Sequence, residues 1–126
     1  MQLNNGNTYT IPVTLGDHKS YPIYIGNDTY SQLGSTIKQL SVGQKLMIVT
    51  HPEIQGLYGE LIADRCEKEG FKVSVVTIPP GEDHKNMATV SQLLDKMIDY
   101  QFERRDTIVA LGGGVIGDTA GFAASI

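Results

Sequence analysis

The feature that most constrains the fold is a regular alternation of short apolar runs with longer segments of helical periodicity. Three runs, residues 45–50, 71–78 and 107–111, are rich in β-branched residues and have the length of strands. Strands that alternate with helices form right-handed βαβ units and a mostly parallel sheet. Runs this apolar favour a sheet covered by helices on both faces. The pattern therefore predicts an α/β domain.

Four segments are predicted to be helices. Asp28 or Thr29 can cap the first, whose apolar stripe is Leu33, Ile37 and Leu40. The second ends at Gly70 and carries an apolar stripe of Ile54, Leu57, Tyr58, Leu61, Ile62 and Cys66. After the break at residues 79–81, the third carries a stripe of Met87, Val90, Leu93, Leu94, Met97 and Ile98. The fourth is an apolar helix that follows residue 111 and reaches Ile126 without a stop signal.

The N-terminal segment has a different period. Polar and apolar residues alternate over 8–15 and again over 21–25, separated by the turn-like sequence Gly16-Asp17-His18-Lys19. Period-two alternation on both sides of a turn predicts an antiparallel strand pair.

Composition excludes several classes of function. A net charge of −4 argues against a nucleic-acid binder, which needs a basic face to neutralise phosphates. No stretch is long and apolar enough to span a bilayer, and the polar N-terminus is unlike a signal peptide. The single cysteine, Cys66, cannot form an intrachain disulfide and falls on the apolar side of a helix. We expect a buried thiol and a cytoplasmic location.

The strongest motif follows the last predicted strand and opens the last helix. In residues 111–118 (LGGGVIGD), Gly112, Gly114 and Gly117 take the three glycine places of the dinucleotide fingerprint. Such glycines let the backbone approach a pyrophosphate, which the amides of a helix N-terminus then face. The loop comes after two earlier βα units, whereas the usual fingerprint lies in the first. The alternative is a tight connection whose glycines serve packing of the helix on the sheet, because Gly117, Gly121 and Ala124 share one helical face.

Asp118 has two interpretations. In the first turn of a helix a carboxylate stabilises the helix dipole. Beside a pyrophosphate it would be repelled, so a functional Asp118 points away and accepts hydrogen bonds from a carboxamide or a sugar hydroxyl.

A second polar turn, residues 80–85 (PGEDHK), lies at the same carboxyl edge of the sheet, where α/β folds bind ligands. Glu82 can accept hydrogen bonds from a ribose diol, and Lys85 can reach a phosphate or hydroxyl. The alternative is a polar turn into a helix, with Glu82 and Asp83 as its N-terminal acids.

Other catalytic arrangements are absent from the sequence. His18, His51 and His84 are far apart and have no carboxylate partner at ligand spacing, so no metal site is predicted. No serine lies in a nucleophile elbow, and no complete acid-base set is present. We therefore predict no catalytic residue in this chain.

The two turns together are more specific than either alone. Residues 81–85 (GEDHK) before a helix, and 112–124 (GGGVIGDTAGFAA) after the next strand, resemble the 3-dehydroquinate synthase family. The resemblance covers nearly the whole chain, including the strand pair and the Leu-Tyr-Gly at 57–59. It implies a Rossmann-like NAD-binding domain, followed in the family by a helical domain that supplies a catalytic zinc, held by a glutamate and two histidines, and most of the substrate-binding groups.

The resemblance also implies which residues contact NAD. Gly81, Glu82 and Lys85 match the family's first NAD-contacting turn, and Gly113, Gly114, Val115 and Asp118 match the second. Together with the fingerprint glycines Gly112 and Gly117, these are the predicted cofactor-binding residues. Many members have an acidic or amide residue where this chain has His51, which leaves the contact to the adenosine side of the cofactor open.

The implied reaction converts 3-deoxy-D-arabino-heptulosonate 7-phosphate to 3-dehydroquinate and phosphate, a carbon-oxygen lyase step of the shikimate pathway. We expect residues 1–126 to be a single NAD-binding domain truncated from a longer, homodimeric enzyme that also holds zinc or another divalent metal. Nothing in the chain matches the zinc ligands or the substrate-binding lysines and arginines. By itself the chain should therefore be inactive.

Three alternatives remain open. Another sugar phosphate cyclase would differ mainly in residues outside this chain. Iron- or zinc-dependent alcohol dehydrogenases have related domains, but their loop is usually of the Gly-Gly-Gly-Ser type, whereas Val115 follows the glycines here. A standalone, non-enzymatic nucleotide-binding module is the third.

Overall fold

Three parallel strands form the central sheet, in the order β5-β4-β6. They are β4 (Lys45–Thr50), β5 (Lys72–Thr77) and β6 (Thr107–Leu111) in a computed structural model that describes residues 2–4, 8–17 and 19–126. Thr50 at the end of the central strand pairs with Thr77 on one side and Leu111 on the other. The three strands therefore end level with one another, and the turns that follow them share one edge, as predicted.

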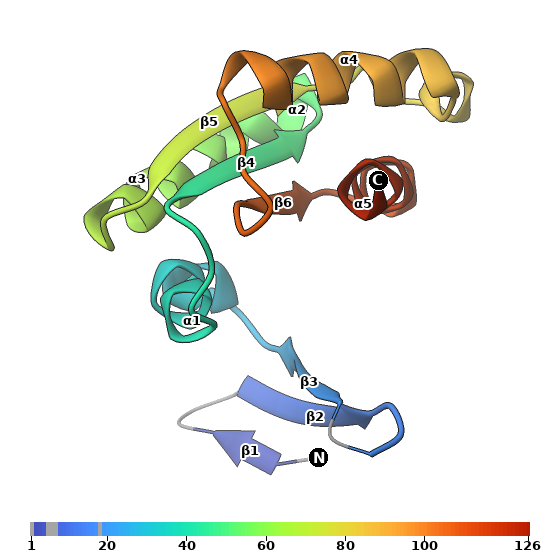
Figure 1. Ribbon diagram of the computed structural model, residues 1–126. Coiled ribbons are helices and arrows are strands. Elements are labelled where there is room, and N and C mark those ends of the chain that lie inside the picture. Colours follow the sequence, from blue (N-terminus) through green and yellow to red (C-terminus); the bar gives the residue numbers. More distant parts are fainter. Residues whose placement is uncertain (1, 5–7, 18) are drawn as a thin grey trace.

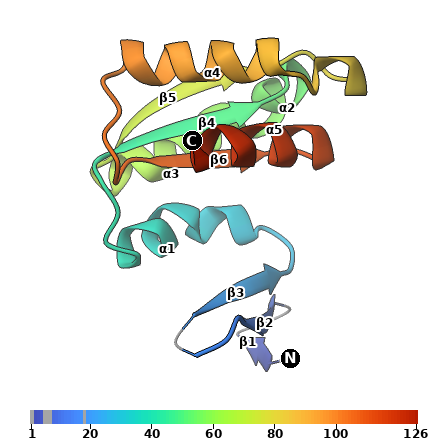
Figure 2. The same cartoon turned by 45° about the vertical axis from the view of Figure 1, so that its right-hand side comes forward.

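Helices cover both faces of this sheet (Figures 1 and 2). One face carries α4 (Met87–Asp99) and α5 (Gly114–Ser125), and the other carries α1 (Leu33–Gln39) and α3 (Glu60–Lys68). The side chains of β4 alternate between the two cores: Met47 and Val49 join the first, Leu46 and Ile48 the second. Burial on both faces explains why the sequence of this strand is one continuous apolar run. The predicted α/β architecture is confirmed.

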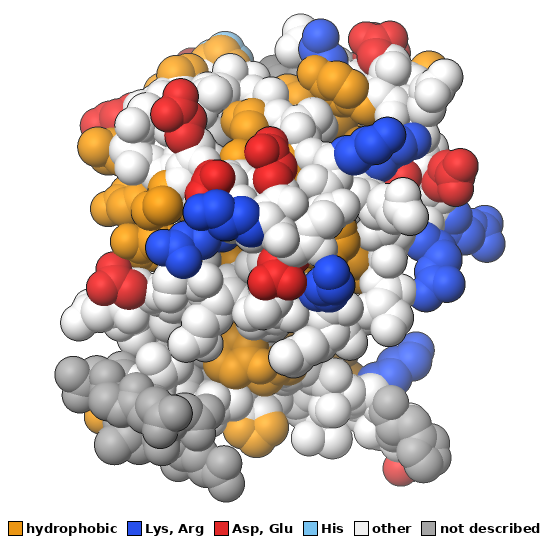
Figure 3. Space-filling model, turned by 90° about the vertical axis from the view of Figure 1, so that its left-hand side faces the viewer, with side chains coloured by type: hydrophobic (Ala, Val, Ile, Leu, Met, Phe, Trp, Pro, Cys, Tyr) orange, Lys and Arg blue, Asp and Glu red, His pale blue; other side chains and the backbone are white. Residues whose placement is uncertain are grey.

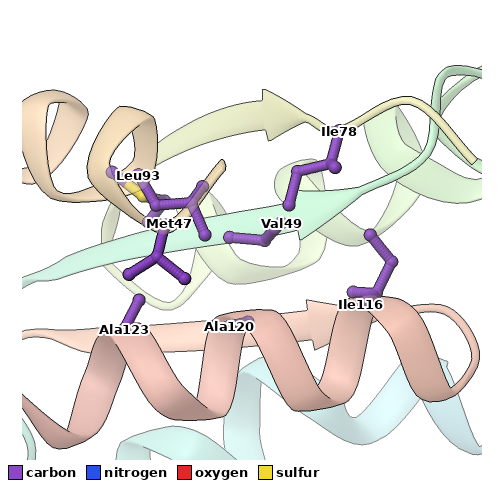
Figure 4. Packing of buried hydrophobic residues seen from close by; sticks show 8 residues of the cluster. Met47, Val49, Ile78, Leu93, Ile116, Ala120 and Ala123 are labelled. Carbon is purple, nitrogen blue, oxygen red and sulfur yellow. The ribbon is translucent and has the colours of Figure 1, made fainter. Parts of the chain in front are cut away.

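The core beneath α4 and α5 is built from small and branched side chains. Figure 4 shows Ile116, Ala120 and Ala123 of α5 directed toward Met47 and Val49. Alanines at the contact let α5 lie close to the sheet. Burial of each large aliphatic side chain here contributes about 1.5–3 kcal/mol.

The N-terminal segment forms a separate antiparallel sheet, in the order β1-β2-β3, that lies beyond α1 (Figure 2). Its strands are β1 (Gln2–Asn4), β2 (Thr8–Thr14) and β3 (Ser20–Ile25). The predicted strand pair is confirmed as β2 and β3, and β1 adds a strand that the sequence analysis did not predict. In the predicted turn, Leu15 donates to the Lys19 carbonyl over 2.7 Å, and His18 lies outside the described residues.

The predicted start of the first helix is wrong. A 3-10 turn, η1 (Thr29–Gln32), precedes α1, and neither Asp28 nor Thr29 caps the helix with its side chain. Asp28 has a positive φ of 57° and accepts a hydrogen bond from the Tyr30 hydroxyl over 3.0 Å. Its carboxylate is thereby directed away from the amides that it was expected to cap. Leu40, the last position of the predicted stripe, follows the end of α1 and is exposed.

The second predicted helix is divided into three parts. A short α2 (Pro52–Ile54) leads into a π-helical turn, η2 (Gln55–Gly59), before α3 begins. A π turn is wider than an α turn, so it rotates the residues around the helix axis. The predicted stripe is only partly buried: Leu57, Tyr58 and Leu61 are exposed, whereas Ile62 and Cys66 are buried. Gly70 follows α3 with a φ of +96°, as expected for a helix stop.

The remaining predicted elements are confirmed with small changes at their ends. β5 is two residues shorter than the predicted run, and Met87 and Ile98 near the ends of α4 are exposed. Cys66 is fully buried, and burial raises the pKa of its thiol, with a further rise from the nearby Glu67 and Glu69 carboxylates.

Charge on the face seen in Figure 3 is mixed, with Lys and Arg side chains interspersed among Asp and Glu. Among the described residues, no helix has the length and apolar character needed to cross a membrane.

Candidate active site at the carboxyl edge of the sheet

The first candidate turn leaves β5 through Ile78 and two prolines. Gly81 then has φ +112° and ψ 148°, a backbone conformation that is essentially restricted to glycine. The 3-10 turn η3 (Glu82–His84) follows, held by hydrogen bonds from the His84 amide to the Gly81 carbonyl and from the Lys85 amide to the Glu82 carbonyl. The strained glycine thus reverses the chain and exposes Glu82 and Lys85 at the edge of the sheet.

Asn86 links this turn to α4. Its side chain accepts from the Thr89 amide over 2.9 Å and donates to the Asp83 carbonyl over 2.7 Å. It therefore caps α4. Glu82 and Asp83, considered as N-terminal acids of this helix, lie in η3 instead, and the first turn of α4 contains no acidic residue. An asparagine directly before a helical run is a recognisable cap signal that the sequence analysis did not use.

The second candidate turn is the glycine loop between β6 and α5. A Cβ on Gly112 would lie 3.0 Å from Ile116 Cγ1, so a side chain at this position would require Ile116 to shift. A Cβ on Gly113 or Gly114 would meet nothing within 4 Å, and no side chain caps α5. The first amides of a helix have no partner within the helix. The glycine loop therefore leaves the first amides of α5 without a side-chain cap and leaves space beside Gly113 and Gly114, as anion binding requires.

An ion pair joins the two turns. Lys85 Nζ lies 2.8 Å from Asp118 Oδ2, and the two side chains are 44% and 61% exposed. The hydrogen bond to Asp118 raises the pKa of Lys85, and the negative charges of Asp118 and Glu82 raise it further. The structure thus brings Glu82, Lys85 and Asp118 into one cluster beside the glycine loop.

Asp118 does not have the helix-dipole role considered from the sequence. The first turn of α5 contains no acidic residue, because the helix begins at Gly114 and Asp118 lies one turn further on. Its carboxylate contacts Lys85 instead.

A cavity of about 390 Å³ opens between α4 and α5 beside this ion pair. Its lining is largely apolar and consists of Lys85, Asn86, Met87, Val90, Asp118, Thr119 and Phe122. Thr119 is only 3% exposed, and its hydroxyl has no hydrogen-bond partner in the structure. The cavity thus combines apolar walls with polar groups at one end. The sequence did not indicate Thr119, because its burial depends on how α5 is rotated against α4.

The packing alternative for the glycines is wrong for Gly117 and Gly121. A Cβ at either position would meet nothing within 4 Å, and Ala124 on the same helical face is exposed. The face of α5 on the sheet carries Ile116, Thr119, Ala120 and Ala123 instead.

The histidines lie apart from one another. His51 is at the end of β4, with Nδ1 2.8 Å from the Ile78 carbonyl, and His84 closes η3. Over residues 2–4, 8–17 and 19–126 there is no group of three or more histidine, cysteine or acidic side chains that could hold a metal ion.

Comparison with known proteins agrees with this geometry. Residues 75–126, which contain both turns, match the family model of the 3-dehydroquinate synthase N-terminal domain. The 3-dehydroquinate synthase of Rippkaea orientalis (strain PCC 8801 / RF-1) is 44% identical over 115 residues, which cover 91% of this chain and 31% of that protein. The chain thus spans about a third of the length of the curated relatives that it matches.

Solved structures of related enzymes have the same fold. A 2-deoxy-scyllo-inosose synthase complexed with carbaglucose-6-phosphate, NAD⁺ and Co²⁺ superposes with a TM-score of 0.81 at 24% identity, over 94% of this chain and 31% of that one. The 2-epi-5-epi-valiolone synthase ValA from Streptomyces hygroscopicus subsp. jinggangensis 5008, with NAD⁺ and Zn²⁺ bound, gives 0.71 at 26% identity, over 90% and 31%. The resemblance stated from the sequence is therefore confirmed: the chain is similar to the N-terminal part of 3-dehydroquinate synthases.

Proposed function

We propose that this chain binds NAD as the cofactor domain of a 3-dehydroquinate synthase, acting on 3-deoxy-D-arabino-heptulosonate 7-phosphate. The observation that carries the proposal is the ion pair between Lys85 and Asp118, which unites the two cofactor turns predicted separately from the sequence. The NAD⁺ bound in the related valiolone synthase supports the choice of cofactor. The 44% identity to a named 3-dehydroquinate synthase supports the choice of substrate over that of another cyclase.

The described residues fit a dinucleotide. The first amides of α5 have no side-chain cap, and the space beside Gly113 and Gly114 lets a pyrophosphate approach the backbone. Local amides are needed, because Glu82, Lys85 and Asp118 together carry a net negative charge. Glu82 and Asp118 accept hydrogen bonds from sugar hydroxyls or the carboxamide, and Lys85 orients both carboxylates. Met87, Val90 and Phe122 provide apolar contact for a ring of the cofactor.

NAD, when bound, supplies reversible hydride transfer. This chain's contribution is to bind and orient the cofactor at the edge of the sheet. No described side-chain cluster is assigned to the divalent metal. We therefore expect no turnover of the heptulosonate phosphate by this chain alone. The proposal for the complete polypeptide includes a homodimer and a cytoplasmic location, where a free buried thiol such as Cys66 stays reduced.

Calorimetric titration with NAD tests the proposal, on this chain and on the complete natural polypeptide that contains it. Saturable binding that Glu82→Ala and Asp118→Ala both weaken by roughly tenfold or more supports it, since a hydrogen bond to a charged group contributes about 1.5–3 kcal/mol. Absence of binding by a folded complete polypeptide would contradict it. Turnover assays of the complete polypeptide with the heptulosonate phosphate and with other sugar phosphates then test the substrate.

A further inference from the structure

The end of the central strand is bonded to both neighbouring strands through two consecutive side chains. The Thr50 hydroxyl donates to the Leu111 carbonyl at the end of β6 over 2.6 Å. The His51 Nδ1 lies 2.8 Å from the Ile78 carbonyl, just beyond β5. Thr50 is fully buried and His51 half-buried. These contacts belong to neither cofactor turn, yet they connect one to the other.

Each bonded carbonyl directly precedes a cofactor turn. Leu111 is followed by Gly112, the first residue of the glycine loop. Ile78 is followed by Pro79 and Pro80, whose rings fix their own φ angles and restrict the residue before each. The position of the Ile78 carbonyl is therefore transmitted through a stiff link to Gly81 and the η3 turn.

The hydrogen-bond chemistry determines which atom of His51 carries the proton. A carbonyl oxygen only accepts, so Nδ1 must carry hydrogen, and it does so in both the neutral and the protonated ring. The Ile78 amide also donates to the Thr50 carbonyl over 2.8 Å. Two hydrogen bonds therefore connect Ile78 to the end of β4.

We propose that Thr50 and His51 are positioning residues that fix the two cofactor turns relative to each other from the end of the central strand. This inference rests on the proposed NAD function and extends it to two residues that it does not use. His51 fixes the position of the turn that carries Glu82 and Lys85. Thr50 fixes the position of the glycine loop that leads to Asp118. The 2.8 Å ion pair between Lys85 and Asp118 depends on both turns being held in place.

Substitutions that remove or keep each donor provide matched pairs. His51→Ala removes the Nδ1 donor, whereas His51→Asn places an amide N–H close to the same position. Thr50→Val removes the hydroxyl at nearly constant shape, whereas Thr50→Ser keeps it. We expect His51→Ala and Thr50→Val each to weaken NAD binding by roughly three- to tenfold, the value of one lost hydrogen bond, and the conservative variants to restore most of it.

Hydrogen exchange on the ligand-free protein tests the inference separately from NAD binding. In His51→Ala the amides of His84 and Lys85, both bonded within the first turn, should exchange faster, while the Gly117 amide, bonded to the Gly113 carbonyl, should not. Thr50→Val should give the reverse pattern. If wild type does not bind NAD, the proposed function fails, and this exchange pattern alone decides whether the two residues hold the turns.

A double-mutant cycle separates positioning from direct contact. If His51 acts through the turn, the loss in NAD affinity from His51→Ala should largely disappear in a Glu82→Ala background. Additive losses with unchanged exchange would show that His51 contacts the cofactor itself and would overturn the inference. Faster exchange spread over the whole sheet, or failure of both His51→Asn and Thr50→Ser to restore binding, would also overturn it.

Discussion

Lys85 Nζ and Asp118 Oδ2 lie 2.8 Å apart, which joins the turn after β5 to the second turn of α5 across the edge of the sheet. Both side chains are roughly half exposed, and exposed ion pairs contribute only about 0–1 kcal/mol to stability. The pair therefore does little to hold the fold together. Its consequence is geometric, because it links the turn that carries Glu82 to the helix that follows the glycine loop.

Exchanging the two charges should separate stability from binding. The double variant Lys85→Asp with Asp118→Lys can re-form the ion pair, so the free energy of unfolding should change by less than about 1 kcal/mol. NAD affinity should fall roughly tenfold or more, because the carboxylate is no longer where the cofactor is expected. Urea unfolding and calorimetric titration measure the two quantities. Wild-type affinity in the exchanged protein would show that only the pairing matters and would contradict an acceptor role for Asp118.

For two of the buried threonines, Thr50 and Thr119, the same substitution should change the free energy of unfolding in opposite directions. Thr119→Val removes a hydroxyl that is buried without a partner and should stabilise the chain by about 1 kcal/mol or more. Thr50→Val removes a hydroxyl that is bonded to the Leu111 carbonyl and should destabilise it by a similar amount. Urea unfolding of both variants tests this. Destabilisation by Thr119→Val would mean that its hydroxyl has a partner in solution.

Replacing either of two glycines by alanine should change the free energy of unfolding, in opposite directions at the two positions. Gly81→Ala forces a side chain into a conformation with φ +112° and should cost about 1–3 kcal/mol or change the turn. Gly121→Ala lies within α5, where a Cβ meets nothing within 4 Å, and should stabilise this chain by about 0.5–1 kcal/mol. Thermal unfolding and NAD titration of both variants provide the measurement. Equal effects would show that the turn at Gly81 is not held in the observed conformation.

Stability should depend on pH through Cys66. Burial raises the pKa of this thiol in the folded chain above the value of about 8.5 expected for an unfolded chain. The contribution of the thiol is therefore fully present below pH ~8.5 and is lost as the pH rises through the folded-state pKa. Above about pH 8.5, wild type should lose stability more steeply than Cys66→Ala, as measured by urea unfolding at several pH values. Parallel pH profiles for the two proteins would contradict a buried thiol.

The local sequence determined the elements and the edge of the sheet at which they converge. The apolar runs at 45–50, 71–78 and 107–111 form β4, β5 and β6. Short continuous apolar runs are typical of strands that are covered on both faces. Parallel strands joined by helices must end on the same side, so the turns after them had to meet. Gly70 and the turns at Gly81 and Gly112 were also predictable, because their backbone conformations or close contacts favour glycine.

Only the tertiary structure decided which face of each helix is buried and which side chains connect the turns. Ile116 and Ala120 face the sheet while Gly121 faces open space, since the rotation of α5 is set by the combined packing of β4 and α4. The π turn at 55–59 interrupts the predicted helix without a local sequence signal, and Leu57 within it is exposed. The carbonyls that Thr50 and His51 bond lie on strands distant in sequence, so these contacts follow from the strand order β5-β4-β6 rather than from any local pattern.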